Sequence, residues 1–361
     1  MTLFIINAHP QDVVGGSEIQ CDLLAAGLTR AGHDVIYLAV NGRQPQYETI
    51  YPVVPCSLKW RELHSLVRRY QPALVYWRFN KRKFLTSVLM FKILHVKVVF
   101  AISHRHDVMK WSHKVLGKDA GTVTKRVRLW SARSRQLLSR RMNHLGYRLV
   151  DGVIAQLDSQ AGKLPVQKQV VIPNSVDPSA VPFAWTSSFV LWVGTIKTVK
   201  NPEAYVELAQ RLQDLQVDFL MVGTIHHARY KYLAQTSKLP PHFQHLGAKS
   251  YAEVNGILQQ SLFLVHTCEP EGLPNIFLQA WMRGKPTISL FYDPDQIIQT
   301  HGLGYVSGDL DQCARDARAL IEDAALRQEM GHRAKHYADA HFRLETNLAA
   351  FEAFVQDLCR E

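Results

Sequence analysis

The sequence predicts an α/β protein made of two doubly wound halves, each a parallel sheet covered by helices. Short, continuous apolar runs alternate with longer stretches of helical periodicity, a pattern typical of parallel strands buried on both faces. This alternation stops at a segment rich in proline and turn-forming residues, 172–182, and then begins again. A chain of 361 residues is also too long for one ordinary core and fits two domains.

In the first half, the buried apolar runs predict strands at residues 3–7, 35–39, 73–77, 96–102 and 152–155. A helix is expected over Ser17–Ala31, because its apolar residues recur at helical spacing. Ser17 is predicted to be the N-cap, since Gln20 follows three residues later. Glu18 then falls in the first turn, where the helix dipole favours an acid.

In the second half, strands are predicted at 189–193, 218–222, 262–266 and 286–290, and helices at 202–212, 251–260 and 275–283. From Leu310 onward the pattern is helical to the end of the chain. The expected domains are therefore 1–172 and 173–340. A final helix at about 341–361 is expected to pack back on the first domain.

Cysteine usage and hydropathy indicate a cytoplasmic protein. The five cysteines are scattered and contain no Cys-x-x-Cys pair, which argues against a disulfide framework or a structural zinc site. The longest apolar stretch, residues 85–102, is interrupted by Lys92, His95 and Lys97, so a bilayer span would be costly. We expect a cytoplasmic location, either free or peripheral on the inner face of the membrane.

The net charge of +11 is unevenly distributed. Residues 1–175 carry 26 Lys+Arg against 10 Asp+Glu, a net charge of +16, whereas residues 176–361 carry 16 against 21, a net charge of −5. The basic half is expected to meet an anionic partner. Residues 122–148 combine one apolar helical face with many basic residues, and two interpretations stay open: a core helix with a solvated back, or docking to an anionic membrane surface or phosphorylated lipid-linked acceptor. No nucleic-acid module is recognised, and no nucleic-acid partner is expected.

Two loops that follow predicted strands and precede predicted helices are candidate phosphate sites. Gly15 and Gly16 would let the backbone approach a ligand closely, in front of a helix N-terminus. After the strand at 189–193, Lys197 and Lys200 are spaced so that both can reach a diphosphate, and Pro202 suits the first helical position. A plain turn and a solvated basic loop are the alternative interpretations.

The segment after the strand at 262–266 is the most informative. It runs through an acidic Gly/Pro turn into a helix that begins near Pro274. Glu271 is expected at the mouth of a cleft. The backbone N–H groups of Gly272, Leu273 and Asn275 would form an anion site beside it, because Pro274 has no N–H.

These motifs resemble those of the GT-B retaining glycosyltransferases of family 4. The chain has a Gly-Gly-Ser-Glu loop after the first strand, a strand-loop with Lys197 and then Lys-Asn-Pro, and PNSVD in the linker, similar to the family's PNGVD. Its acidic segment resembles the family's Glu-x7-Glu motif, with Glu271 first and Gln279 in place of the second glutamate. The similarity covers nearly the whole chain, most clearly residues 169–345.

The resemblance implies two Rossmann-like domains facing a central cleft, the first on the acceptor side and the second binding the donor. It also implies transfer of a sugar from a nucleotide diphosphate sugar, with retention, to a glycan or lipid-linked acceptor in polysaccharide or glycoconjugate synthesis, without metal or other cofactor. Glu271 would bind sugar hydroxyls and Gln279 the ribose diol. The implied donor site comprises Gly15, Gly16, Thr195, Lys197, Lys200, Gly247, Ala248, Lys249, Glu271, Gly272, Leu273, Pro274, Asn275 and Gln279.

The residues expected at the reacting centre are His104, Lys200 and Glu271. The family places a histidine after the strand at 96–102, and position favours His104 over His106 for this role. Asp293 and Asp295 resemble the Asp-x-Asp metal motif of another glycosyltransferase fold, but are predicted to cap a helix. Gln279 loses a charge-assisted bond that is worth about 1–2 kcal/mol more than a neutral one. The alternative function is therefore a catalytically silent relative that acts as a binding or scaffold protein.

Overall fold

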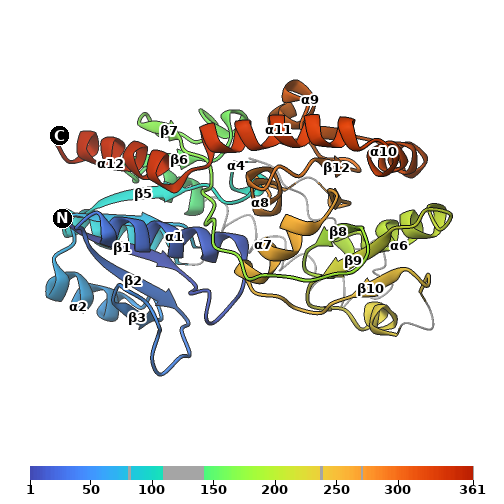
Figure 1. Ribbon diagram of the computed structural model, residues 1–361. Helices are drawn as coiled ribbons and strands as arrows, with labels where there is room; N and C mark the ends of the chain where they lie inside the picture. The colour runs from blue at the N-terminus through green and yellow to red at the C-terminus, as the bar shows by residue number, and fades with distance from the viewer. Residues whose placement is uncertain (80–82, 109–141, 236–238, 270, 361) are drawn as a thin grey trace, which may run out of the picture. The chain divides into compact units, whose positions relative to one another are not determined.

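The fold was analysed in a computed structural model that describes residues 1–79, 83–108, 142–235, 239–269 and 271–360 (Figure 1). The chain divides into two compact units. The first contains Met1–Ile172 together with Leu348–Glu361, and the second contains Pro173–Asn347. Each unit has one parallel β-sheet with helices packed on it, so the predicted fold class is confirmed. Of the basic segment 122–148, residues 122–141 lie outside the described residues.

The first unit has a seven-stranded sheet in the order β3-β2-β1-β4-β5-β6-β7, and every ladder in it is parallel. All five predicted strands are present, and β3 and β7 were not predicted. The strands are β1 (Thr2–Asn7), β2 (Asp34–Val40), β3 (Val53–Cys56), β4 (Leu74–Trp77), β5 (Lys97–Ala101), β6 (Gly152–Ala155) and β7 (Gln169–Val171).

Both faces of this sheet are covered, which explains the continuous apolar runs. In β1, Phe4 and Ile6 point to one face, where they pack with helices α2 (Trp60–Tyr70) and α3 (Phe84–Ile93). Leu3 and Ile5 point to the other face, against α1 (Gly16–Arg30) and α12 (Leu344–Arg360). The contacts of α12 come from Phe351, Val355 and Leu358, all fully buried.

The start of α1 differs from the prediction. The helix begins at Gly16, its N-cap is Gly15, and no side chain caps it. Ser17 is therefore inside the helix, and its assignment as N-cap was wrong. The capping pattern was misplaced because the extended backbone of the cap residue is as accessible to glycine as to serine. Glu18 does lie in the first turn, as predicted.

The second unit has a six-stranded parallel sheet in the order β10-β9-β8-β11-β12-β13. The strands are β8 (Phe189–Val193), β9 (Asp218–Val222), β10 (Phe243–His245), β11 (Leu264–His266), β12 (Thr287–Ser289) and β13 (Gly304–Val306). Of these, β10 and β13 were not predicted. The helices are α6 (Pro202–Arg211), α7 (Tyr251–Gln260), α8 (Asn275–Met282), α9 (Ile297–His301), α10 (Leu310–Glu322) and α11 (Ala324–His341).

The long helical pattern after Leu310 is confirmed, but it is divided into three helices. Along α11, basic and acidic side chains pair at i,i+4 spacing, with Lys335 2.6 Å from Asp339 and Arg333 paired with Glu329.

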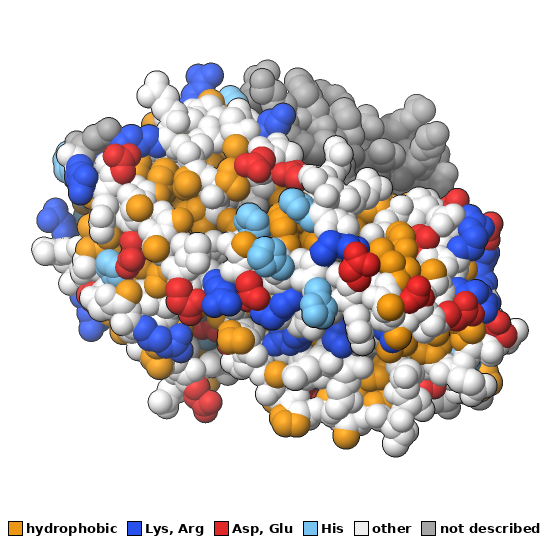
Figure 2. All heavy atoms as spheres, turned by 45° about the horizontal axis from the view of Figure 1, so that its top comes forward, with side chains coloured by type: hydrophobic (Ala, Val, Ile, Leu, Met, Phe, Trp, Pro, Cys, Tyr) orange, Lys and Arg blue, Asp and Glu red, His pale blue; other side chains and the backbone are white. Residues whose placement is uncertain are grey.

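On the face that Figure 2 draws, Lys and Arg side chains (blue) and Asp and Glu side chains (red) are interspersed rather than gathered in one patch of a single sign. In the described part of the chain, no helix combines the length and the apolar character needed to span a bilayer.

Candidate functional site

The loops at the carboxyl edge of the second sheet touch one another through backbone atoms. Gly223, after β9, has a φ of +150°, and a Cβ atom there would lie 1.9 Å from the carbonyl oxygen of Gly194, after β8. Its N–H donates to the carbonyl of Gly247, after β10, at 2.8 Å. Only glycine allows this approach, which places the loop after β9 against both the segment that begins at Thr195 and the one that continues to Ala248.

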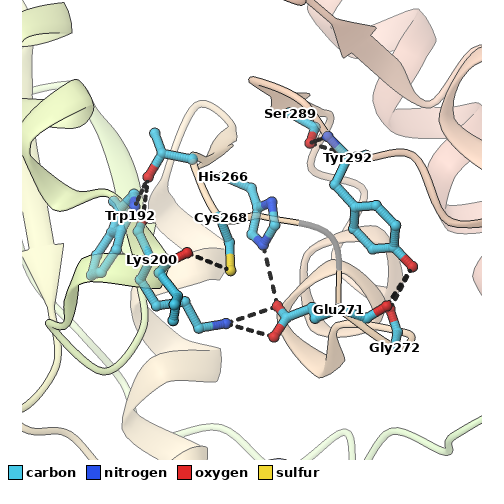
Figure 3. Close-up of polar contacts among 10 residues, drawn as sticks. Trp192, Lys200, His266, Cys268, Glu271, Gly272, Ser289 and Tyr292 are labelled. Atoms are coloured by element: carbon cyan, nitrogen blue, oxygen red, sulfur yellow. Dashed lines mark hydrogen bonds and ion pairs between the residues drawn. The ribbon is translucent and has the colours of Figure 1, made fainter. Parts of the chain in front are cut away.

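The main polar feature at this edge joins two residues predicted for the reacting centre. Lys200 ends a short 3-10 turn, Thr198–Lys200, and its Nζ atom lies 2.8 Å from both carboxylate oxygens of Glu271 (Figure 3). About a fifth of each side chain is exposed, 19% for Lys200 and 24% for Glu271. The ion pair is therefore reachable from solvent but is weakly screened.

The pair fixes both charges over the physiological pH range. Burial alone would raise the pKa of Glu271, but His266 and Lys200 outweigh it and lower that pKa to about 2. Burial alone would lower the pKa of Lys200, yet Glu271 outweighs it and the pKa is raised. Glu271 is consequently an acceptor only, and Lys200 a donor only, at neutral pH.

His266, the last residue of β11, supports the carboxylate from behind. Its Nε2 atom lies 3.4 Å from Oε1 of Glu271, and burial lowers its pKa. A neutral imidazole facing an ionised carboxylate must carry its proton on Nε2. Nδ1 is then the unprotonated nitrogen, and it is fully buried without a partner among the described residues.

Two further contacts hold the turn that carries Glu271. The hydroxyl of Tyr292 shares its proton between the carbonyl oxygens of Glu271, at 2.9 Å, and Gly272, at 2.8 Å. On the other side, Thr267 donates to the carbonyl oxygen of Lys200 at 2.7 Å and accepts from the indole N–H of Trp192 (Figure 3). The ends of β8, β11 and β12 are thereby tied together around the ion pair.

The same place contains atoms that could ligate a metal. His266, Cys268 and Glu271 each have a ligand atom within 4.8 Å of the others, the one such group among the described residues. The fit is poor for a resident divalent ion, because the ammonium of Lys200 already contacts both oxygens of Glu271 and would repel it. Burial also raises the pKa of the Cys268 thiol to about 11, which disfavours the thiolate that a metal requires.

The Asp-x-Asp sequence serves a helix, as predicted. The carboxylate of Asp293 accepts the N–H groups of Ile298, at 2.9 Å, and Gln299, at 3.1 Å, in the first turn of α9. Asp295 has a left-handed backbone, with φ at +49°, inside the turn that precedes this helix. The Asp293 carboxylate therefore satisfies two N–H groups in the first turn of α9, although the N-cap residue of this helix is Gln296.

The remaining donor-site candidates of the second unit have varied surroundings. Lys249 pairs with Glu253 of α7 at 3.3 Å, and Asn275 accepts a hydrogen bond from the side chain of Asn174 at 2.7 Å. Gln279 is buried and donates to Asn255 at 2.7 Å. Gly272, Leu273 and Pro274 are buried at the start of α8, and Lys197 lies one turn before Lys200.

The candidates of the first unit lie at the carboxyl edge of its own sheet. Gly15 and Gly16 form the start of α1, after β1. His104 follows β5, and its backbone N–H donates to Asp107 at 2.9 Å. Its side chain is half-buried. The side chain of His106 is outside the described part of the chain.

Several residues at these edges were not predicted from the sequence. Arg78, after β4, is buried and donates to Ser103 at 3.3 Å and to Tyr76 at 3.2 Å, but a single arginine after a strand carries no motif. Tyr292 was missed because its partners are backbone carbonyls. His266 was detectable as a polar residue that ends an apolar strand.

Comparison with known proteins identifies the family. The family described as "Glycosyl transferases group 1" matches residues 156–337. No curated protein sequence matches the chain significantly.

Three solved structures share the fold over almost the whole chain. Sucrose-phosphate synthase from Thermosynechococcus elongatus has a TM-score of 0.73 at 15% identity and covers 99% of both chains. HepE from Anabaena, solved with UDP-glucose, has a TM-score of 0.72 at 14% identity, covering 99% of this chain and 100% of HepE. A glycosyltransferase from Rickettsia africae has a TM-score of 0.73 at 16% identity, covering 99% and 98%. The fold is that of the GT-B glycosyltransferases, and the chain belongs to the glycosyl transferases group 1 family.

Proposed function

We propose that the chain is a metal-independent, retaining glycosyltransferase of the family 4 type, which moves a sugar from a nucleotide diphosphate sugar to a glycan or lipid-linked acceptor. The observation that carries the proposal is the Lys200–Glu271 ion pair at the carboxyl edge of a parallel sheet, beside the start of α8. Ligands of open parallel sheets bind at this edge, where helix N-termini favour phosphate. The donor-binding unit is Pro173–Asn347.

The charges of this pair suit departure of a diphosphate. Breaking the bond between the anomeric carbon and the phosphate oxygen leaves negative charge on the diphosphate, which Lys200, Lys197 and the α8 N-terminus would stabilise. Glu271 is ionised at neutral pH and can only accept, so we assign it to hydroxyls of the transferred sugar.

The same charges restrict where the acceptor's proton goes. A raised pKa keeps Lys200 protonated, so it cannot remove a proton, and the low pKa of Glu271 makes it a weak base. We therefore assign the proton to the leaving diphosphate, in a front-face attack. The acceptor oxygen forms a bond to the anomeric carbon, and the bond between that carbon and the oxygen of the leaving phosphate breaks. The acceptor's proton moves to a phosphate oxygen.

We assign the first unit to binding of the acceptor and to contacts with the transferred sugar. In this assignment His104 lies beside the reacting centre, and Gly15 and Gly16 lie near the diphosphate. The excess of basic residues in 1–175 supports an anionic acceptor or membrane surface, reached from the cytoplasmic side. Cell-surface polysaccharide or glycoconjugate synthesis is the process we propose.

The test is release of nucleoside diphosphate from UDP-, GDP-, ADP- and dTDP-sugars, with the anomeric configuration of the product read by NMR. UDP-glucose is the first donor to try, because HepE was solved with it. We expect one donor to be consumed with retention. Glu271→Gln should abolish turnover, whereas Glu269→Gln, on the exposed side of the same loop, should leave it unchanged. An inverted product would refute the front-face mechanism, and donor binding without any turnover would favour a silent binding protein.

A further inference from the structure

A buried amide pair joins the two helices that follow the donor-site loops. Asn255, in α7, is fully buried, and Gln279, in α8, is 5% exposed. The Nε2 atom of Gln279 donates to Oδ1 of Asn255 at 2.7 Å. Gln279 stands at the position of the second glutamate in the family's Glu-x7-Glu motif.

The orientation of the Asn255 amide is fixed by backbone atoms. Its Nδ2 atom donates to the carbonyl oxygens of Asp177, at 3.1 Å, and Ser179, at 2.6 Å. Because both carbonyls can only accept, nitrogen must face them and oxygen must face Gln279. A residue at 279 therefore meets a fixed acceptor.

The surrounding backbone leaves little room for another arrangement. Arg283 donates to the carbonyl oxygens of Asn255, at 3.0 Å, and Gln279, at 3.2 Å, and so clamps both helices. Gly256 packs so closely on the segment after the linker that a Cβ atom would lie 1.7 Å from the carbonyl oxygen of Val181. The Asn255 side chain cannot turn over without breaking these contacts.

A fixed acceptor at 255 requires a donor at 279. Glutamine has one, whereas an ionised glutamate would place a second acceptor against Oδ1 and leave a buried charge unpaired, which is costly. With Nε2 committed to Asn255, Oε1 is the polar atom that Gln279 has left, and no described residue donates to it.

We propose that Asn255 is a positioning residue, which sets the Gln279 amide so that Oε1 accepts a hydrogen bond from the ribose hydroxyls of the donor nucleotide. The ribose assignment rests on the proposed function, whereas the amide pair does not. Glutamine is then the competent residue at 279, and restoring the glutamate of the resemblance weakens both the fold and ribose recognition.

The first arm of the test measures stability without ligand. Gln279→Glu should lower the melting temperature at pH 8 and lower it less at pH 5, because a protonated glutamate can donate to Oδ1 of Asn255. The same substitution in an Asn255→Ala background should cost less than in the wild type, since the opposing acceptor is gone. Gln259→Glu, at an exposed position of α7, is the matched control and should change little. A Gln279→Glu variant as stable as the wild type at pH 8 would overturn the amide pair.

The second arm measures affinity by calorimetry for UDP, GDP or ADP, whichever raises the wild-type melting temperature most, and for its 2′-deoxy counterpart. The wild type should prefer the ribonucleotide by roughly tenfold, which corresponds to one hydrogen bond of about 1.4 kcal/mol. Asn255→Ala and Gln279→Glu should each lose most of this preference, and Gln259→Glu should keep it. An unchanged preference in Asn255→Ala would overturn the positioning role. If the wild type binds none of these nucleotides, the proposed function and the ribose assignment fail together, whereas the stability arm still decides on the pair.

Discussion

Replacing Glu271 by glutamine removes the negative charge that faces Lys200 and leaves the shape of the side chain almost unchanged. In the folded protein the pKa of Glu271 is about 2, against an ordinary value of 4.5. At pH 7 this difference corresponds to about 3 kcal/mol of folding free energy. The figure applies to the loss of the charge alone, because glutamine keeps an oxygen that accepts from Lys200, as a protonated glutamate would. For a unit of this size, the melting temperature should fall by roughly 2–4 °C per kcal/mol lost.

The sign of the pH dependence follows from the lowered pKa. A carboxyl group whose pKa is lower when folded stabilises the protein above its unfolded pKa, and this contribution disappears as the pH falls toward the folded pKa. The free energy difference between wild type and Glu271→Gln should therefore be largest from about pH 5 upward and shrink to about 1 kcal/mol at pH 3.

The assay is urea unfolding of wild type, Glu271→Gln and Glu269→Gln at pH 7 and pH 3. Glu269 is exposed in the same loop and controls for loss of any acid at this edge. A difference of less than about 0.5 kcal/mol between wild type and Glu271→Gln at pH 7, which is typical of an exposed pair, would refute the reasoning. So would a difference that is the same at both pH values.

Three further predictions concern other parts of the structure. Tyr292→Phe should lower kcat/KM for the donor by roughly tenfold with the circular dichroism spectrum unchanged, because the turn of Glu271 loses the hydroxyl that holds it. Gly256→Ala should lower the melting temperature by several degrees despite the better helix propensity of alanine, because its Cβ would meet the carbonyl of Val181. Of the five thiols, exposed Cys359 alone should react rapidly with a disulfide reagent in the native protein, and the buried four only after addition of guanidinium.

Much of the fold could be predicted from the sequence because both sheets are parallel and covered on both faces. Strands such as β1 and β8 are then continuous apolar runs, which local pattern reveals. The strands that were missed, β3, β7, β10 and β13, are three or four residues long, and all four lie at a sheet edge. Short edge strands are specified by pairing with a neighbour, which a local pattern does not contain.

The candidate site could be predicted where a charged residue follows the end of a predicted strand. Lys200 and Glu271 were predicted separately, from two loops 71 residues apart, and the structure brings them to 2.8 Å. Of the partners that set their geometry, Tyr292 acts through backbone carbonyls, which have no sequence signature, whereas His266 was detectable as a polar residue that ends an apolar strand. Gln279 was noted as a departure, but its partner Asn255 could be found only from the packing of α7 on α8.

The central claim is that a lysine–glutamate pair, rather than a metal, serves a nucleotide diphosphate. Its most direct test is calorimetric titration of the protein with UDP, GDP, ADP and dTDP in the presence of EDTA, with Lys200→Met as the comparison. The account predicts that one nucleoside diphosphate binds equally well with and without EDTA, and that Lys200→Met weakens its binding by at least roughly tenfold. Binding that requires a divalent ion, or that is unchanged in Lys200→Met, would contradict it.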